Sequence, residues 1–492
     1  MIIVRKILWF RYDLRIEDNE SFNEALKDGN TLPIFIFDEN FFKLETSSSF
    51  HLNFTIESLK DLKNIFKEKY NTKLNIYYGD TLDILKYLSN KYKVSEIYST
   101  HHFKNKYLRD MDIKIKSLCD ENNISWKIYN QFGIQLSNRN GKIWSQNWNS
   151  LIVRKINQFQ LNGSFIEDDH EINFSSISTN IFDHKNIQNG GRENALKLLD
   201  SFIDHRSTDY QKKMSSPITG ETACSRLSPH ITYGNVSLRE IYNKTQSINN
   251  DSNLYEKKKS INSFRKRLAW HCHFIQKFYD QPDIEYTNMN TAFDGIRENS
   301  FNEAYFEAWK NGTTGYPFVD ACMRYLKNKG WINFRMRAML VSFASYQLWL
   351  DWRITSKYLA KLFTDYEPGI HYSQFQMQSG TTGINAIRIY NPIKQSRDQD
   401  PDAVFIKKWI PELSNIPSSL VHEPWKLTYL DQKSYDIQIG ENYPLPIVDN
   451  AKETNNSRDR IWKIKKSHES KILSASILKK HTSSSPKIRN FN

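Results

Sequence analysis

Short apolar runs alternate with amphipathic segments along roughly the first 130 residues of the chain. The runs KILWF (residues 6–10) and TLPIFIFD (31–38) predict buried strands, and LKDLKNIFKEKY (59–70) predicts a helix. Strands that alternate with helices are typical of β-α units, in which helices cover both faces of a parallel sheet. The pattern therefore predicts a doubly wound α/β domain over residues 1–137.

The pattern changes after this domain. Residues 138–191 are rich in Asn, Ser, Asp and Gly, which predicts a long linker. From residue 192 the apolar spacing takes the helical period, and a well-marked helix is predicted between Pro317, which suits a first turn, and Gly330, which suits a C-terminal cap. An all-α domain is therefore expected over residues 192–440. A basic, Ser-rich and partly disordered tail is expected over 441–492.

Two stretches of the helical region stand out. In NFRMRAMLVSFASYQLWL (333–350), Asn333 and Arg337 lie one turn apart, and Ser342 and Ser345 belong to an adjoining face of small residues. Small residues at this spacing let another helix or a flat ligand approach closely, and both alternatives remain open. Residues 365–392 show little periodicity, which predicts an irregular loop rich in polar and aromatic side chains.

Composition adds two features. The formal net charge is +13, which favours a polyanionic partner, although lysines that solvate an ordinary surface explain it equally well. Phe, Trp and Tyr make up 14% of the chain, with 12 Trp, and such rings stack on flat ligands or bases as well as filling a core. Composition alone leaves both alternatives open for each feature.

The cysteines and the apolar runs indicate the compartment. The 4 cysteines are scattered without a C-x-x-C pair, so no disulfide framework is predicted and a reducing compartment is expected. The N-terminal apolar run lacks a cleavage site, and no stretch approaches the roughly 20 apolar residues of a membrane span. We expect a cytoplasmic protein without a membrane segment, associated with the nucleoid if the source is bacterial.

Several kinds of chemistry are disfavoured. No G-x-G-x-x-G follows the first strand, which argues against a Rossmann dinucleotide site, and H-E-x-x-H, G-x-S-x-G and P-loop motifs are absent. His271 and His273 point to different sides of a helix, so no metal site is predicted. CSRLSP (224–229) places hydroxyls beside an arginine at a helix start, which suits either an anion or a plain cap.

Five stretches, in order along the chain, resemble the DNA photolyase and cryptochrome family. They are LWFRYDLRIEDN (8–19), SRLSPHITYGNVS (225–237), AWKNGTTGYPFVDACMRYLKNKGWINFRMR (308–337), DWR (351–353) and RIYNPIKQSRDQDPDAVFIKKWIPEL (388–413). The resemblance runs from residue 6 to about residue 425. It implies an α/β domain that carries an antenna chromophore (a folate, a deazaflavin or none) and a helical domain that holds FAD.

The resemblance also implies the residues that contact FAD. They are Tyr210, Cys224, Ser225, Arg226, Leu227, Ser228, Trp270, Trp331, Arg337, Asp365, Glu367 and His371. Hydroxyls and amides of residues 224–228 would bind the pyrophosphate. Arg337, paired with Asp365, would lie along the isoalloxazine and favour a negative or reduced ring.

In this family, light drives an electron from reduced flavin to a cyclobutane pyrimidine dimer flipped out of UV-damaged DNA. The residues implied in DNA binding are His271, Arg335, Arg388, Lys394 and Arg397. Those implied in catalysis are His371, Trp352, Trp349, Cys272 and Met377. The resemblance thus implies a monomeric carbon–carbon lyase.

The chain departs from the family pattern around the flavin. His371 stands where photolyases usually have Asn beside the flavin N5. Phe375 and Asn299 replace the first and last tryptophans of the usual electron relay, and only Trp352 is kept. Since Phe is far harder to oxidise than Trp, the usual relay should fail. Trp349 or Tyr346 offers another route.

Lesion recognition departs as well. Cys272 replaces a dimer-binding Glu and Met377 replaces a dimer-packing Trp, while Phe334 and Ala338 replace the histidine pair of six-four photolyases. Either the chain repairs dimers through other contacts, such as His271, His371 or Tyr372, or it is a cryptochrome-like blue-light sensor. A binding module without photochemistry would require loss of FAD, which the intact 224–228 stretch argues against.

Overall fold

The computed structural model describes residues 5–136, 141–156, 162–169, 174, 187–246 and 255–481. The chain forms two compact units, each assembled from several stretches. Unit 1 comprises Met1–His205, Ser225–Pro282 and Thr364–Gly369, and unit 2 comprises Arg206–Cys224, Asp283–Phe363 and Ile370–Asn492. Both units therefore interleave along the chain, whereas the sequence predicts contiguous domains.

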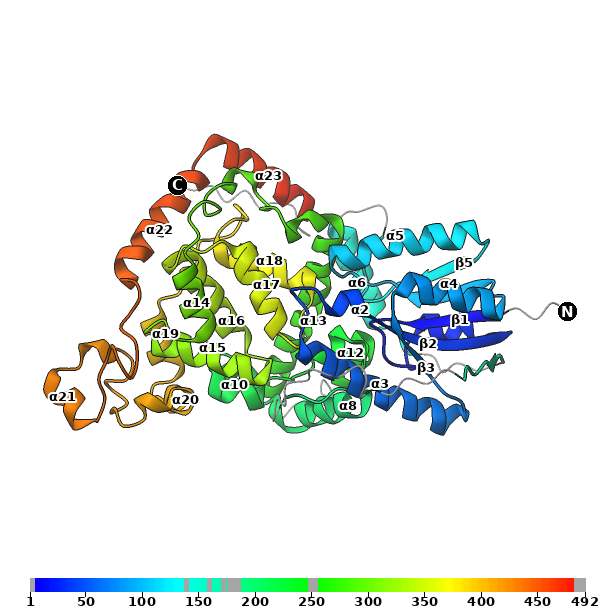
Figure 1. The fold of residues 1–492 in the computed structure, drawn as a ribbon, viewed down its shortest axis with the longest axis horizontal. Coiled ribbons are helices and arrows are strands. Elements are labelled where there is room, and N and C mark those ends of the chain that lie inside the picture. The colour runs from blue at the N-terminus through cyan, green and yellow to red at the C-terminus, as the bar shows by residue number, and fades with distance from the viewer. Residues whose placement is uncertain are drawn as a thin grey trace. The chain divides into compact units, whose positions relative to one another are not determined.

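Unit 1 contains a parallel sheet in the order β3-β2-β1-β4-β5 (Figure 1). Its strands are β1 (Arg5–Phe10), β2 (Asn30–Asp38), β3 (Asn75–Gly79), β4 (Glu96–Thr100) and β5 (Ser125–Tyr129). A short strand, β6 (Ser164–Phe165), pairs in parallel with β2. The order reverses direction between β1 and β4, so the predicted doubly wound α/β fold is confirmed.

The sheet is buried on both faces, which explains its continuous apolar strands. Ile7 and Trp9 of β1 pack with helices α4 (Thr81–Tyr92) and α5 (Lys106–Glu121). Leu8 and Phe10 point the other way and pack with α1 (Glu20–Ala25) and α3 (Ser49–Tyr70). Figure 1 shows α3 on the opposite side of the sheet from α4 and α5. Successive side chains of a strand alternate between faces, so two helical layers require apolar residues at every position.

The predicted linker contains regular structure. Helix α6 (Gly141–Ile152) and strand β6 both lie within residues 138–191. Trp144 and Trp148, one helical turn apart, are buried at 7% and 5% exposure. Polar residues around these two aromatics hide the helical period in the sequence. Residues 137–140, 157–161, 170–173 and 175–186 lie outside the described part of the chain.

The described residues from 187 onward form helices and one isolated β-bridge, as the sequence predicts. Unit 1 contributes α8 (Arg192–Ser201), α11 (Ser228–Thr232), α12 (Leu238–Gln246) and α13 (Tyr255–Asp280). Unit 2 contributes α9 (Tyr210–Lys213), α10 (Pro217–Ala223), α14 (Glu303–Asn311), α15 (Pro317–Lys329), α16 (Phe334–Ser342), α17 (Trp352–Leu362), α19 (Pro392–Gln399), α20 (Val404–Trp409) and α21 (Tyr429–Ser434). No described helix combines the length and the hydropathy that a membrane span needs.

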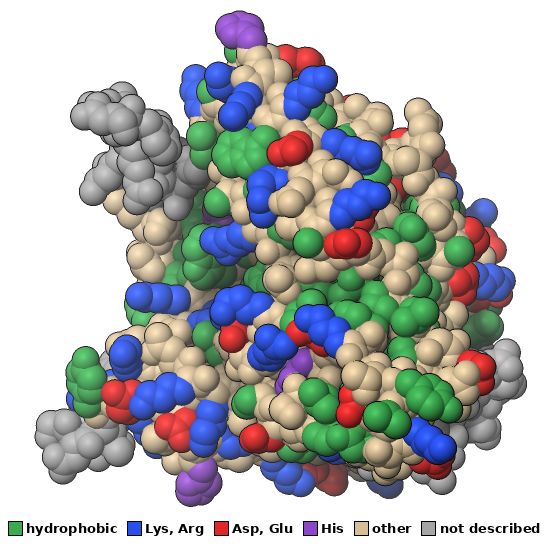
Figure 2. Space-filling view, turned by 90° about the vertical axis from the view of Figure 1, so that its left-hand side faces the viewer, with side chains coloured by type: hydrophobic (Ala, Val, Ile, Leu, Met, Phe, Trp, Pro, Cys, Tyr) green, Lys and Arg blue, Asp and Glu red, His purple; other side chains and the backbone are tan. Residues whose placement is uncertain are grey.

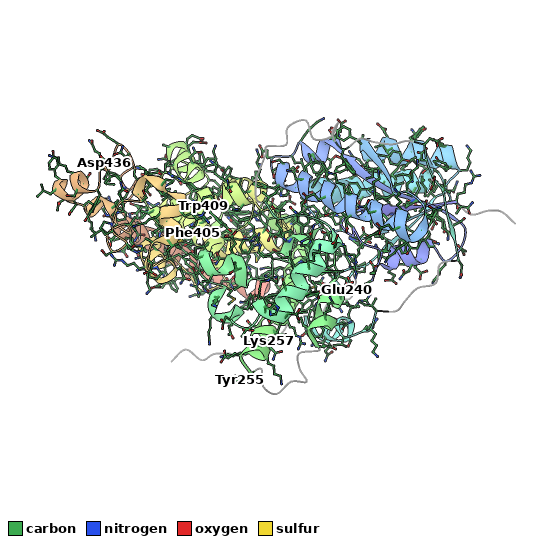
Figure 3. All side chains as sticks on the ribbon, turned by 90° about the horizontal axis from the view of Figure 1, so that it is seen from below. Glu240, Tyr255, Lys257, Phe405, Trp409 and Asp436 are labelled. Carbon is green, nitrogen blue, oxygen red and sulfur yellow. The ribbon has the colours of Figure 1, made fainter. Side chains whose placement is uncertain are left out.

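Helix α15 confirms its sequence signals. Pro317 opens it, and Gly330 ends it with a φ of +64°. Phe405 and Trp409, one turn apart on α20 and labelled in Figure 3, pack against Tyr325 of α15 with ring centroids 5.4 and 5.1 Å from it. These aromatic contacts anchor α20 on the core of unit 2.

Residues 365–392 were expected to be an irregular loop, and this prediction is wrong for its first half. Helix α18 spans Pro368–Ser379. Most of its side chains are buried, including the polar Gln376, whose amide donates to the carbonyls of Ile284 (2.9 Å) and Thr287 (2.8 Å). A helix buried on all sides has no polar face, so its sequence shows no amphipathic period.

The expected tail contains two helices in its described part. They are α22 (Asn450–Lys465) and α23 (His468–His481), and both belong to unit 2. Ile461 is fully buried with Phe293 and Tyr346, and the Asn290 amide donates to Ser474 Oγ at 3.0 Å. Residues 482–492 lie outside the described part of the chain.

Asp320 ties the first turn of α15 to the chain near Tyr443. Its carboxylate accepts from the amide (2.9 Å) and hydroxyl (2.7 Å) of Thr314, from the Gly315 amide (3.1 Å) and from the Tyr443 hydroxyl (2.5 Å). Burial nevertheless raises the pKa of Asp320 to about 6. Burial therefore destabilises the charged carboxylate of Asp320, and its four hydrogen-bond donors only partly offset this cost.

We expect the stability of the protein relative to Asp320→Asn to fall as pH rises. The pKa of Asp320 is higher in the folded state than in the unfolded state. The stabilisation of the folded protein by protonation of Asp320 is therefore complete below about pH 4 and is lost as pH passes about 6, and the free energy of unfolding changes by about 3 kcal/mol. Urea unfolding at several pH values measures it. The exposed Asp459→Asn serves as control, and parallel curves for wild type and Asp320→Asn would contradict the expectation.

Candidate functional site

The acidic segment Thr364–Gly369 is tied to the sheet domain within unit 1. Glu367 Oε2 lies 2.5 Å from Nζ of Lys104, which follows β4, and the two side chains are 3% and 6% exposed. The Lys104 ammonium also lies 4.5 Å from the centre of the Tyr12 ring. Burial raises the pKa of Glu367, and the charge of Lys104 opposes that rise. Lys104 thus holds Glu367 in place and supports its negative charge.

The predicted DNA contact His271 is neutral inside unit 1. Its two ring nitrogens are buried and have no hydrogen-bond partner among the described residues, and the ring lies 5.2 Å from Phe132. Burial, with a smaller effect of Lys104, lowers the pKa of His271 to about 3. A neutral imidazole carries no positive charge to attract a phosphate, and the predicted DNA contact of His271 stays a prediction.

Two further predicted residues lie beside His271. Cys272 is fully buried, and burial raises the pKa of its thiol to about 12, so the thiol is protonated, and its predicted catalytic role stays a prediction. Trp270 is 56% exposed and stacks on Phe274 at 5.7 Å. An exposed ring also suits stacking on an unpaired base, and its predicted FAD contact stays a prediction.

The 224–228 stretch forms a tight turn. Arg226 has a φ of +61°, a left-handed conformation that costs a non-glycine residue about 1 kcal/mol. Gln188 holds it from both sides, since its amide nitrogen donates to the Arg226 carbonyl (2.7 Å) and its oxygen accepts from Arg226 Nε (3.2 Å). Leu227 N–H lies 3.4 Å from Ser225 Oγ, and Ser228 begins α11. The proposed contacts with pyrophosphate stay a prediction.

Unit 2 brings two predicted site residues, His371 and Arg337, against Phe363. His371 lies 5.9 Å from Phe363 and 4.5 Å from Phe375 between ring centroids, and the Arg337 guanidinium lies 4.2 Å from the Phe363 ring. His371 Nε2 is 2.9 Å from the Ser356 carbonyl, which only accepts, so Nε2 carries a proton. The ring orientation of His371 is therefore fixed. Arg337 belongs to unit 2 and Asp365 to unit 1, and their predicted pairing stays a prediction.

The small-residue face of α16 is covered by protein. Ser342 Oγ accepts from the Tyr390 amide at 3.0 Å, and the Gln347 amide donates to the Tyr390 carbonyl at 2.9 Å. The close approach that small residues allow is therefore used by the segment around Tyr390, rather than by a helix or a flat ligand at this point. Tyr210 and Trp331, two other predicted FAD contacts, are buried in unit 2.

The candidate electron donors have different surroundings. The Trp349 ring lies 4.4 Å from the guanidinium of Arg297 and 4.8 Å from that of Arg460. Trp352 is 1% exposed and donates from Nε1 to Asn288 Oδ1 at 2.8 Å. Cations beside a ring oppose the loss of an electron from it. The surroundings therefore favour Trp352 over Trp349 as a donor.

The basic residues that the resemblance implies in DNA binding are only partly available to bind DNA. Lys394 pairs with Asp398 at 3.2 Å, and Arg397 pairs with Glu423. Arg388 is exposed and has no ion pair among the described residues, while Arg335 is half-buried. Figure 2 shows Lys and Arg interspersed with Asp and Glu on the face it draws. Arg388 is thus the predicted DNA contact least neutralised by the chain itself.

Sequence reasoning missed Lys104 and Arg297. Nothing distinguishes them locally among 68 Lys and Arg residues, and each gains its role from partners distant in the chain. Met377 is half-buried on α18, and its predicted role stays a prediction. Among the described residues, no three His, Cys, Asp or Glu side chains group as a metal site would require.

Comparison with known proteins decides the family. The model of DNA photolyase matches residues 6–131, and that of the FAD-binding domain of DNA photolyase matches residues 264–463. The crystal structure of an archaeal photolyase from Sulfolobus tokodaii with two FAD molecules is 30% identical, covers 94% of this chain and 100% of its own, and superposes with a TM-score of 0.77. The chain belongs to the DNA photolyase and cryptochrome family.

Two relatives show the breadth of the photolyase and cryptochrome family. A deoxyribodipyrimidine photo-lyase of Alkalihalophilus pseudofirmus is 36% identical over 268 residues, which is 54% of this chain and about half (53%) of that protein. A cryptochrome DASH of Synechocystis is 26% identical over 90% of this chain and 94% of that protein. Repair enzymes and cryptochromes therefore both resemble this chain.

The chemistry of several residues of this photolyase-family chain fits a bound FAD. Oε1 of Glu367 is buried, and no described residue donates a hydrogen bond to it. A buried carboxylate oxygen is costly without a donor, and hydroxyl-rich FAD has donors to offer. The hydroxyls of Ser225 and Ser228, which belong to the same unit as Glu367, have the chemistry to donate hydrogen bonds to a phosphate.

Proposed function

We propose that the protein is a blue-light-dependent photolyase that splits cyclobutane pyrimidine dimers in DNA. The observation that carries the proposal is the match of residues 264–463 to the FAD-binding domain of DNA photolyase. Its support is the presence, within that domain, of an ordered His371–Phe363–Arg337 cluster and the exposed Arg388.

Under this proposal the side chains of the chain bind, orient and exclude water. Ser225 and Ser228 bind the pyrophosphate. Glu367, held by Lys104, accepts a hydrogen bond from a hydroxyl group of the cofactor. Phe363 and Phe375 keep water from His371, which holds its proton at Nε2. Reduced FAD, when bound and illuminated, supplies the electron that dimer splitting requires.

A cryptochrome-like blue-light receptor is the second candidate. The protonated, buried Cys272 and the neutral His271 give little support to the expected lesion contacts. Helices α22 and α23 add a folded C-terminal segment that could bind a partner. A receptor would need the same FAD-binding residues without repair.

One experiment separates the two candidates. The FAD-loaded protein is reduced and illuminated with single-stranded and double-stranded DNA that contains thymine dimers, and the restored thymine is quantified. Repair in proportion to light dose supports the photolyase. Absence of repair despite bound, reduced FAD would reject it in favour of the receptor.

Arg388→Ala should weaken the binding of damaged DNA, measured as affinity at several salt concentrations. An arginine that neutralises one phosphate releases about one counterion, so the slope of log affinity against log salt should fall by about one in magnitude. Arg388→Lys should restore part of the affinity. The exposed Arg458→Ala on α22 is the matched control, and an equal loss there would contradict a specific role of Arg388.

A further inference from the structure

A cavity of about 350 Å³ opens in unit 1 at the carboxyl ends of β4 and β5. It is lined by Thr100 and Tyr129 at those strand ends, by Trp148 of α6 and by the segment 237–239. Ligands of open α/β sheets usually bind outside the carboxyl ends of the strands, near the point where the strand order reverses. None of the residues predicted to contact FAD or DNA lines this cavity.

The cavity holds a buried cation that has no carboxylate partner among the described residues. Arg15 is 5% exposed, and its terminal nitrogens donate to the carbonyls of Gly234 (3.0 Å) and Asp18 (3.0 Å). Its Nε has no hydrogen-bond partner among the described residues. The Asp18 carboxylate is already taken by Arg239 and by the Ser237 hydroxyl (2.5 Å). A buried guanidinium without a carboxylate is costly, so an anion bound here would offset that cost.

The charge around the cavity favours an anion. Four basic side chains line it, against two carboxylates, and these six are Arg15, Arg154, Lys155, Arg239, Asp18 and Glu20. Arg154 and Lys155 are exposed, whereas Arg15 is buried within. An anionic group would therefore meet positive charge both as it enters and once it is bound.

The remaining lining suits a heterocyclic ring. Trp148, Tyr129 and Phe132 supply aromatic surface, and Gln131 has a buried Oε1 without a hydrogen-bond partner among the described residues. The amide of Asn23 is a further donor and acceptor. Aromatic surface with a few polar groups that lack partners is the usual lining of a site for a small ring-containing ligand.

The geometry points to a binding site for a nucleoside monophosphate, separate from the FAD and DNA sites of the proposed function. The phosphate lies toward Arg15, Arg154 and Lys155, and the base lies against Trp148 and Tyr129. The volume of about 350 Å³ is at the lower end of the range for small-ligand pockets, which fits one nucleotide rather than a dinucleotide.

Titration calorimetry of AMP, adenosine and inorganic phosphate into the full-length, FAD-loaded protein tests the site, because bound FAD blocks its own adenosine pocket. We expect saturable binding of AMP and at least about tenfold weaker binding of adenosine and of phosphate alone, since each lacks half of the contacts. Amide hydrogen exchange should show protection by AMP at residues 129–133 and 148–156.

Arg154→Ala/Lys155→Ala should weaken AMP binding at least about tenfold and leave the FAD absorbance unchanged. The control Lys86→Ala/Lys114→Ala removes two exposed charges from α4 and α5 and should change the affinity less than twofold. Arg154→Glu is a second single-site test. Absence of saturable binding, protection elsewhere, or equal loss in the control would overturn the inference.

Discussion

Lys104→Met should lower the free energy of unfolding of the FAD-loaded protein by about 3–5 kcal/mol. The Lys104–Glu367 pair is almost completely buried, with side chains 6% and 3% exposed. Removal of the cation leaves a buried carboxylate whose other oxygen already has no donor among the described residues. An uncompensated buried charge costs more than the pair itself contributes.

The loss in free energy of unfolding caused by Lys104→Met should depend on pH. Burial already raises the pKa of Glu367, and loss of the opposing ammonium raises it further. A carboxyl group whose folded-state pKa is raised contributes stability that is present at low pH and is lost as pH rises. The deficit should therefore be smaller at pH 5 than at pH 8 in urea unfolding.

Lys104→Met/Glu367→Gln should recover most of the lost stability, because a neutral amide tolerates the buried position. Lys116→Met breaks an exposed pair with Asp120 and should cost no more than about 0.5 kcal/mol. A deficit of Lys104→Met that is the same at both pH values and is not reduced in the double variant would contradict the role assigned to the pair.

Trp352→Phe should slow light-driven reduction of the oxidised flavin at least about tenfold, whereas Trp349→Phe should leave it nearly unchanged. A unit charge about 4.5 Å from a ring that becomes a cation costs roughly 3–4 kcal/mol at an effective dielectric constant near 20. Trp349 has two such charges, from Arg297 and Arg460 at 4.4 and 4.8 Å.

The cation beside Trp352 is better compensated. Arg353 lies 5.1 Å from the Trp352 ring, and its guanidinium is bound by Asp351 (3.1 Å) and Glu298 (3.0 Å). Tyr346 is a poor alternative, because its buried hydroxyl has no hydrogen-bond partner among the described residues to take the proton that oxidation releases. Trp352 is therefore the donor with the least electrostatic penalty of the three.

Steady-state photoreduction of the four variants Trp352→Phe, Trp349→Phe, Tyr346→Phe and Arg460→Ala measures the route. Arg460→Ala removes one cation from Trp349 and should not slow reduction, since it can only make that ring easier to oxidise. A larger loss in Trp349→Phe than in Trp352→Phe would reject the assignment.

Much of the fold follows from local sequence signals. The strands of the parallel sheet are continuous apolar runs because helices bury both faces of the sheet. Helix α15 is marked at both ends, by Pro317 and by Gly330, whose φ of +64° a residue with a side chain rarely adopts. Such features are visible because the residues that determine them are neighbours in the chain.

Helices without a polar face were harder to predict. In α18 nearly every side chain is buried, so the alternation that reveals a surface helix is missing. In α6 two buried tryptophans stand among Asn, Ser and Gln, and a composition typical of linkers concealed them. Both helices are stabilised by packing rather than by an amphipathic pattern.

The sequence by itself determined the fold class, the family and the residues that carry the resemblance to FAD-binding photolyases, because these depend on ordered motifs and on local periodicity. Only the tertiary structure decided that His271 and Cys272 are buried and uncharged, and that Trp349 lies against two guanidinium groups. It also decided the partner of Glu367, which lies 263 residues away along the chain. Burial and contact between distant residues set the charge of each group, and no local pattern encodes them.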